Sequence, residues 1–227
     1  DLETFMKTKF KAVLKYNYYI TKNTFCRPAR TEGNIFTYNN IVIDIDDHES
    51  RSGMVAWEKD VLKTELLYAA EGELLDVEIP PISAIVDTGR GLQVWYSFDG
   101  IAAKNKKAYR LVTEAIIDKV QQVCEKIHDE HPEFVMKVDV AASKNAAGLV
   151  RLPGTTNAKT KNVSEIVYFN EEMKNRKFFG PDGLSSVLSF SALSAPDSTI
   201  KAGKEEKNKV PVTKDGKPGP NRVAAAR

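Results

Sequence analysis

Two acidic side chains lie two residues apart in an apolar segment. The run Ile41-Val42-Ile43-Asp44-Ile45-Asp46 predicts a β-strand, because β-branched residues favour extended backbone. Since side chains alternate along a strand, Asp44 and Asp46 share one face at a spacing of about 7 Å. Two carboxylates beside an apolar core repel each other unless a cation lies between them. Oxygen ligands of this kind suit Mg²⁺ or Mn²⁺, which can orient a nucleoside triphosphate. The plainer alternative is a strand end with two solvated acids.

A glycine-rich turn between two apolar segments is the second feature. Val86-Asp87 leads into Thr88-Gly89-Arg90-Gly91, and a further strand-like segment begins at Leu92. Glycine permits positive φ and a close approach of the backbone to a ligand, and exposed amides bind phosphate oxygens. The Thr88 hydroxyl and the Arg90 guanidinium can add to such a site. The alternative is an ordinary hairpin turn with an incidental arginine.

A third acid follows in Val138-Asp139-Val140. We expect a strand here, with Asp139 on the face opposite the two valines, so that it completes a metal site with the first two acids. Lys144 and Arg151 follow and could neutralise a triphosphate. The alternative is a loop in which Asp139 and Arg151 form a salt bridge.

In their order and on their predicted elements, these segments resemble the three signature motifs of archaeo-eukaryotic primases. Asp44-Ile45-Asp46 matches the first motif, Thr88-Gly89-Arg90-Gly91 the second and Val138-Asp139 the third. The run Arg151-Leu152-Pro153-Gly154-Thr155 is similar to the replication primases of plasmids, phages and mobile elements. The resemblance covers roughly residues 35–160. It implies a primase-polymerase that joins nucleotides, NTP or dNTP, on a single-stranded DNA template.

The resemblance also implies residue roles and partners. It assigns the binding of Mg²⁺ or Mn²⁺ to the acids Asp44, Asp46 and Asp139. It assigns nucleotide phosphate binding to the second motif, at Thr88, Arg90 and Gln93. That motif usually ends in histidine, whereas this chain has Gln93, which donates hydrogen bonds but carries no charge. A helicase, or a helical domain following the core, is the further partner expected outside these residues.

The elements that must position these side chains alternate between helices and strands. Helical spacing of apolar residues predicts helices over 2–14, from a Ser52 cap to about Ala70, and over Lys104–Glu130. Strands are predicted over 16–20, 35–38, 41–46, 82–86, 92–98, 134–140 and 165–169, with a hairpin turn at Asn39-Asn40. This order predicts an α+β fold with a mostly antiparallel sheet flanked by helices. The primase resemblance implies that the sheet is RNA-recognition-like.

Charge divides the chain into two parts. Residues 201–227 hold eight Lys and Arg against Glu205, Glu206 and Asp215, which gives +5 and leaves −3 on the rest of a chain whose net charge is +2. The body is therefore not a basic DNA-coating protein, and nucleic-acid contacts there need local clusters such as Lys104, Lys106 and Lys107, or Lys159 and Lys161. We expect a catalytic domain over residues 1–197 and a disordered basic linker or tail over 198–227.

Cysteine content and hydropathy exclude several classes of protein. The two cysteines, Cys26 and Cys124, indicate neither a disulfide framework nor a cysteine-based zinc site. No apolar run reaches the length of about 18 residues that a membrane span needs. A cytoplasmic protein is the expectation.

Two other functions compete with that of a primase. Tyr18 and Tyr19 are adjacent, as in replication initiators that nick DNA through a tyrosine, but the sequence has no His-x-His metal motif. A non-catalytic module that binds single-stranded nucleic acid is the second, with Trp95, Tyr96 and Phe98 as base-stacking residues. These aromatics could equally belong to the core.

Overall fold

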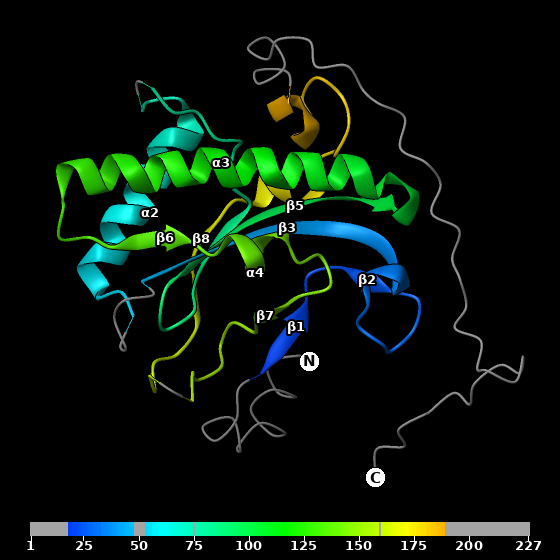
Figure 1. Ribbon diagram of the computed structural model, residues 1–227, viewed down its shortest axis with the longest axis horizontal. Helices are drawn as coiled ribbons and strands as arrows, with labels where there is room; N and C mark the ends of the chain where they lie inside the picture. Colours follow the sequence, from blue (N-terminus) through cyan, green and yellow to red (C-terminus); the bar gives the residue numbers. More distant parts are fainter. Residues whose placement is uncertain (1–17, 48–52, 75, 159, 189–227) are drawn as a thin grey trace, which may run out of the picture. The chain divides into compact units, whose positions relative to one another are not determined.

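An antiparallel sheet carries the fold. The computed structural model describes residues 18–47, 53–74, 76–158 and 160–188 (Figure 1). The main sheet has the strand order β2-β3-β5-β4-β8, and β6 pairs with β3. All of these pairings are antiparallel, which confirms the predicted α+β fold. The strands are β2 (Thr24–Phe25), β3 (Ile35–Asp47), β4 (Ala84–Asp87), β5 (Leu92–Ala102), β6 (Met136–Val138) and β8 (Glu165–Phe169).

Smaller elements complete the described part of the chain. Strand β1 (Tyr19–Thr21) pairs with β7 (Leu149–Arg151) in a separate two-stranded sheet. The short helix α4 (Val140–Lys144) lies between β6 and β7 in the sequence. Four 3₁₀ helices cover η1 (Glu32–Asn34), η2 (Ala103–Asn105), η3 (Glu171–Asn175) and η4 (Leu184–Ser186).

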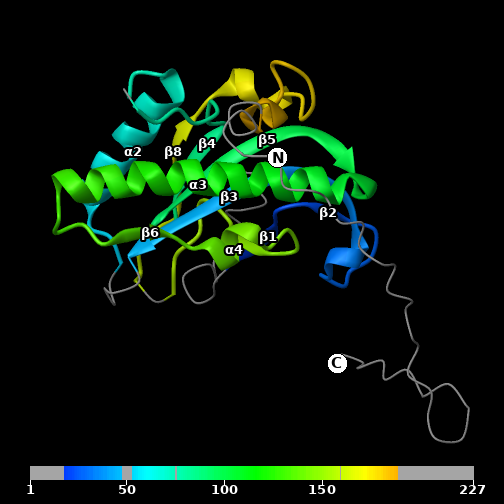
Figure 2. The same cartoon turned by 45° about the horizontal axis from the view of Figure 1, so that its top comes forward.

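The two faces of the main sheet differ in chemistry. On β3, Ile41, Ile43 and Ile45 are fully buried in the hydrophobic core. That core also contains the inward side chains of α2 (Ala56–Glu71) and α3 (Lys106–Glu130), and Figures 1 and 2 show α3 lying along the sheet. Because side chains alternate, Asp44 points to the other face. The apolar layer thus positions the strand and leaves Asp44 on the face away from the core.

The predicted helices agree with the structure where it describes them. Helix α3 buries every residue of the predicted apolar stripe, namely Tyr109, Val112, Ile116, Val120, Val123 and Ile127. Gly72 ends α2 in the left-handed conformation at φ 74°, which glycine adopts at little cost. Helix α2 begins at Ala56, where the Val55 N–H donates to the Glu58 side chain at 2.7 Å. The suggested cap, Ser52, lies outside the described residues.

The predicted hairpin turn at Asn39-Asn40 is wrong, because residues 35–47 form one continuous strand. The Asn23 side-chain oxygen accepts the N–H groups of Asn39 and Asn40 at 2.8 and 3.2 Å. The register of β3 against β5 shifts between Tyr38 and Asn40. The asparagines therefore form a bulge that a side chain from another segment satisfies, and the chain continues without turning.

The predicted strand over residues 134–140 is too long. Strand β6 ends at Val138, and Asp139 is the N-cap of α4, with its Oδ1 accepting from the Ala142 N–H at 2.8 Å. Aspartate is a favoured capping residue. Asp139 therefore does not project from a strand between two inward valines, and Val140 is 42% exposed.

Some predictions concern residues outside the described ranges. The helix over 2–14, Lys159 and the tail over 198–227 are among them. The tail and the domain boundary at residue 197 therefore stay predictions. Within the described residues, no helix is long and apolar enough to cross a membrane.

Gly91 allows β5 to begin directly beside β3. A Cβ atom at this position would lie 2.1 Å from the Ile45 carbonyl oxygen, which is backbone and cannot move aside. We expect Gly91→Ala to lower the free energy of unfolding by about 1–3 kcal/mol, measured by urea denaturation. Gly33→Ala is the control, because no atom lies within 4 Å of its added Cβ. Equal effects of the two substitutions would contradict the steric explanation.

Candidate active site

The first and third acids are joined through the backbone. Asp44 lies opposite Gln93 in the β3–β5 pair. Its N–H donates to the Ser143 hydroxyl at 3.0 Å, and its carbonyl accepts from the Asp139 N–H at 2.8 Å. Helix α4 is thereby fixed to β3, with the Asp139 side chain at its N-terminus. The structure thus brings Asp44 and Asp139 together, as the motifs predicted.

Electrostatics identify Asp44 as the central acid. Burial raises the pKa of the Asp44 carboxyl; a hydrogen bond from the Gln93 side chain opposes that rise, and the nearby charges of Asp46 and Asp139 add to it. Asp46 and Asp139 therefore each lie close enough to Asp44 for their charges to repel its carboxylate. A cation at this place would relieve that repulsion.

Lys22 is a residue of this site that the sequence did not reveal. It is 3% exposed and follows β1. Its Nζ donates to the Ala142 carbonyl at 2.6 Å, to Val42 at 3.3 Å and to Ser143 at 3.5 Å. Burial lowers its pKa to about 8, although Asp44 and Asp139 act to raise it. Lys22 therefore links β3 to α4 and supplies positive charge beside the acids.

The glycine-rich turn places an arginine on the second acid. The turn closes through the Thr88 N–H, which donates to the Gly91 carbonyl at 3.0 Å, and Gly89 has φ 80°. The Thr88 hydroxyl accepts from the Gly91 N–H at 3.1 Å. Arg90 extends from the turn, and its Nε lies 2.8 Å from Asp46 Oδ2. The predicted turn is confirmed, and it joins the Asp46 carboxylate to a guanidinium.

A second ion pair, between Lys59 of α2 and Asp87 at the end of β4, stabilises the glycine-rich turn. Lys59 of α2 is 8% exposed, and its Nζ contacts both carboxylate oxygens of Asp87 at 2.8 and 3.1 Å. Asp87 Oδ1 also accepts the Gly89 N–H at 2.7 Å. Lys59 therefore holds the residue that shapes the turn carrying Arg90.

We expect Lys59→Met to lower the free energy of unfolding by about 1–3 kcal/mol, because Asp87 loses its charged partner in a half-buried place. Lys63→Met on the same helix is the matched control. Lys63 forms an exposed pair with Asp60, and such pairs contribute about 0–1 kcal/mol. Chemical denaturation of both variants measures the difference, and similar losses would mean that the Lys59–Asp87 pair does not support the turn.

The other two predicted nucleotide ligands, Lys144 and Arg151, each contact a neighbouring side chain. Lys144 forms an exposed ion pair with Glu114 of α3, with Nζ 3.0 Å from Oε1. Arg151 is 9% exposed on β7, and its guanidinium carbon lies 5.2 Å from the centre of the Tyr19 ring. The contacts described at the acids come from β3, β5, α4, the glycine-rich turn and Lys22.

The three acids are suitable ligands for a hard divalent cation, but their carboxylates do not surround a common position. Within the described ranges, no group of three or more His, Cys, Asp and Glu side chains is placed to hold a metal ion. Asp46 is bound by Arg90, and Asp139 caps α4. All three donors are carboxylates, the preferred ligands of Mg²⁺ and Mn²⁺. Beside them, the buried Gln93 Oε1 has no hydrogen-bond partner in the described part of the chain. A buried acceptor without a donor lowers stability, so a ligand that donates a hydrogen bond to this oxygen would be favoured.

The aromatic residues and histidines named for the competing functions differ in their exposure and contacts. Tyr96 and Phe98 are core residues at 0% and 4% exposure, so neither can stack on a base. Trp95 is partly exposed and lies on the same face of β5 as Gln93. Of the histidines, His128 bonds to the Phe134 carbonyl at 2.8 Å and His131 stacks on the Phe134 ring. Both therefore lie at the end of α3, and His48 is outside the described residues.

Comparison with known proteins adds distant similarities. No protein-family model matches the sequence. The chain is 25% identical over 151 residues to a protein of Clostridium perfringens named "Replication protein", and the match covers 66% of this chain and 32% of that protein. The chain thus spans about a third of that relative's length. Among solved structures, the AEP domain of the cyanophage S-2L primase-polymerase aligns over 77% of this chain and 69% of that one, with a TM-score of 0.48 and 16% identity.

Proposed function

We propose that this chain is the catalytic domain of a primase-polymerase, which joins nucleotides on single-stranded DNA by using a divalent metal. The observation that carries the proposal is the position of Asp44. Its backbone is hydrogen-bonded to Asp139, the charges of Asp46 and Asp139 act on its carboxylate, and Asp46 is paired with Arg90 of the glycine-rich turn. The similarity to a protein named "Replication protein" supports a role in replication. A helicase or a helical domain as a further partner remains a prediction.

The metal ligands in this proposal are Asp44, Asp46 and Asp139. A bound Mg²⁺ or Mn²⁺ would neutralise triphosphate charge and favour ionisation of the attacking hydroxyl. The reaction joins a 3′ oxygen to the α-phosphorus of the incoming nucleotide and releases pyrophosphate. The chain's own residues must bind that nucleotide and hold its phosphates in line with the attacking oxygen.

Arg90 has two competing anionic partners in this proposal. Without a nucleotide it pairs with Asp46. A triphosphate offers stronger charge-assisted hydrogen bonds, so Arg90 would turn to the phosphates and leave the Asp46 carboxylate available to the metal. Gln93 would keep Asp44 in place through its hydrogen bond. Nucleotide and metal are therefore expected to bind cooperatively.

A template-directed extension assay tests the proposal. A labelled primer on a single-stranded DNA template is incubated with the protein, NTPs or dNTPs, and Mg²⁺ or Mn²⁺. We expect products longer than the primer that depend on the template and disappear with EDTA. A protein that yields no EDTA-sensitive product on any template would contradict it.

A non-catalytic module that binds single-stranded nucleic acid is the second candidate. The ion pair that engages Asp46 with Arg90 favours it, as does Gln93 where the primase motif has histidine. It predicts binding to single-stranded DNA without extension of a primer. The assay above, combined with a binding measurement, separates the two functions.

A further inference from the structure

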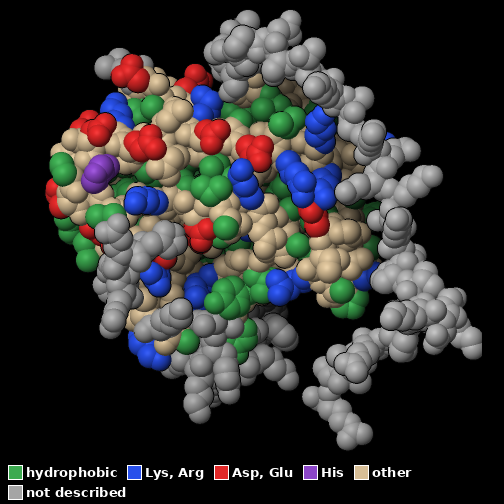
Figure 3. All heavy atoms as spheres, in the orientation of Figure 1, with side chains coloured by type: hydrophobic (Ala, Val, Ile, Leu, Met, Phe, Trp, Pro, Cys, Tyr) green, Lys and Arg blue, Asp and Glu red, His purple; other side chains and the backbone are tan. Residues whose placement is uncertain are grey.

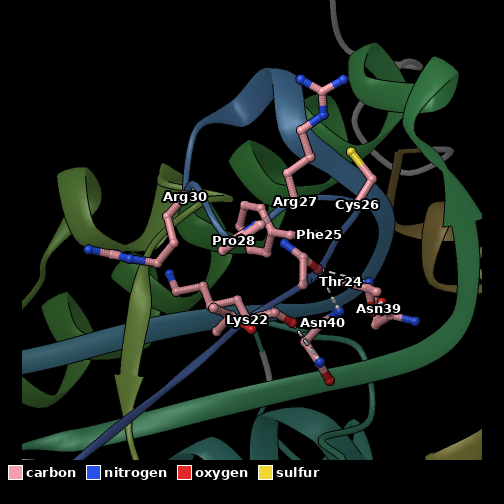
Figure 4. Close-up of a pocket in the computed structure, with 11 residues that line it drawn as sticks. Lys22, Thr24, Phe25, Cys26, Arg27, Pro28, Arg30, Asn39 and Asn40 are labelled. Atoms are coloured by element: carbon pink, nitrogen blue, oxygen red, sulfur yellow. Dashed lines mark hydrogen bonds between the residues drawn. The ribbon is translucent and has the colours of Figure 1, made fainter. Parts of the chain in front are cut away.

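A basic pocket lies beside the candidate active site. It has a volume of about 610 Å³ and is lined by residues of the β1–β2 segment, the loop after β2 and the bulge in β3. Three of its eleven lining residues are Lys or Arg, namely Lys22, Arg27 and Arg30, and none is Asp or Glu. Figure 4 shows the guanidinium groups of Arg27 and Arg30 extending in different directions, with Phe25 and Pro28 between them.

The charges of the two pocket arginines, Arg27 and Arg30, are not compensated by an ion pair in the part of the chain that the structure describes. Glu32, an acid a few residues farther along the chain, is bound by Lys106 and Arg110 of α3, with Nζ and Nη2 both 2.8 Å from its Oε2. Arg27 and Arg30 are exposed and form no ion pair within the described residues. In Figure 3, Lys and Arg side chains gather over the right-hand end of α3. Lys106 therefore forms an ion pair with Glu32. It is one of the three lysines predicted above as a local cluster for nucleic-acid contact.

The pocket and the candidate active site share strand β3 and the side chain of Lys22. Asn40 lines the pocket and points to the same face of the strand as Asp44. Four residues of strand span about 13 Å. Lys22 lines the pocket as well, while its Nζ reaches the carbonyls beside Asp44 and Asp139. A nucleic-acid strand that occupies the active site would therefore need to extend only about 13 Å along β3 to reach the pocket.

We propose that this pocket binds the sugar-phosphate backbone of the single-stranded nucleic acid that the active site uses. Arg27 and Arg30 would contact phosphodiester oxygens, and the half-buried Phe25 ring would pack against a sugar or a base. The inference rests on the proposed function for the identity of the strand. A free nucleoside triphosphate has the same phosphate chemistry, so the test must separate the two ligands.

Binding is measured with a fluorescent single-stranded oligonucleotide, by anisotropy, without nucleotide or metal. We expect Arg27→Ala/Arg30→Ala to weaken binding at least about tenfold. Loss of two phosphate contacts should reduce the salt dependence by about 1.4 log units per log unit of salt, at about 0.7 for each contact. Arg27→Lys/Arg30→Lys keeps both charges and should recover most of the affinity. Circular dichroism checks that the variants are folded.

The charge-matched control is Lys63→Ala/Lys126→Ala, which removes one cation from α2 and one from the later part of α3, neither of which lines the pocket. It should change oligonucleotide binding by less than about twofold. An equal loss in this control would overturn the pocket assignment and indicate attraction by general charge. Unchanged binding by the arginine variant, or no binding by the wild type, would overturn it as well.

A second measurement uses a fluorescent nucleoside triphosphate. Arg27→Ala/Arg30→Ala should leave nucleotide affinity within about twofold of the wild type, and a selective loss of nucleotide binding would show that the pocket takes free nucleotide instead. Because neither assay involves catalysis, an inactive wild-type protein that shows the expected loss of DNA binding would refute the polymerase activity and leave the pocket assignment standing.

Discussion

Replacing Asp44 by Asn is expected to reduce template-directed nucleotide addition by more than about 100-fold. Changes to groups that merely orient a metal ligand cost about 10- to 100-fold, and this substitution removes the charged ligand itself. Asparagine has nearly the same shape, and the hydrogen bond between the Asp44 N–H and Ser143 uses the backbone. Activity is measured as the initial rate of primer extension at saturating Mg²⁺ and nucleotide.

The same substitution should not destabilise the protein in the absence of metal. The pKa of Asp44 is raised by burial and by the charges of Asp46 and Asp139, against the opposing effects of Gln93 and Lys22, so ionising this carboxyl costs more in the folded protein than in the unfolded chain. A neutral amide side chain in its place would remove that cost, and the melting temperature should hold or rise. Full activity in the variant, or a large fall in melting temperature, would contradict the role assigned to Asp44.

Replacing Lys22 by Met is expected to produce the largest loss of stability among the substitutions considered. The side chain is buried, and its ammonium group donates to three carbonyls on β3 and α4. Methionine fills similar space but donates no hydrogen bond. We expect the free energy of unfolding to fall by about 3 kcal/mol or more, since hydrogen bonds to a charged group contribute about 1.5–3 kcal/mol. Urea denaturation measures it.

Lys104→Met is the control for this experiment, because Lys104 is exposed, and it should change stability by less than about 0.5 kcal/mol. If Lys22→Met folds, the mutual positions of Asp44 and Asp139 should still be less well fixed. A higher metal concentration for half-maximal activity would then be expected. A variant as stable as the wild type, with an unchanged metal requirement, would exclude this linking role.

The parts of the fold that the sequence predicted depend on periodic patterns. The apolar stripe of α3 continues along the helix, and every predicted member is buried, because a long amphipathic helix has one way to hide its apolar face. The alternation of isoleucine and aspartate on β3 likewise places Asp44 opposite the core. The glycine-rich turn is determined by local chemistry, and it forms as predicted.

The errors occur where distant segments decide the local structure. The Asn39-Asn40 pair is a frequent turn sequence, but Asn23 accepts both of its N–H groups and the strand continues. Asp139 looks like a strand residue between two valines, yet the Ala142 N–H makes it a helix cap. Such contacts cannot be read from spacing within a short segment.

Contacts between distant segments also explain why the sequence indicated only part of the candidate site. Motif order identified Asp44, Asp139 and the turn that carries Arg90. Lys22 lies far before the first acid in the sequence and matches no pattern; only the return of the chain through β1 and β7 brings it to α4. Lys144 forms an exposed ion pair with Glu114, and its contact with a nucleotide stays a prediction.

The central claim is that Asp44, Asp46 and Asp139 together hold a divalent cation. Titration of the protein with Mn²⁺, followed by electron paramagnetic resonance in the presence of a nucleoside triphosphate, tests it directly. The spectra should show protein-bound Mn²⁺ in the wild type, beyond the Mn²⁺ bound by nucleotide alone. Asp44→Asn and Asp139→Asn should each abolish that bound fraction, while Asp60→Asn, which changes an exposed acid of α2, should leave it unchanged. Equal Mn²⁺ binding by the wild type and by Asp44→Asn would contradict the claim.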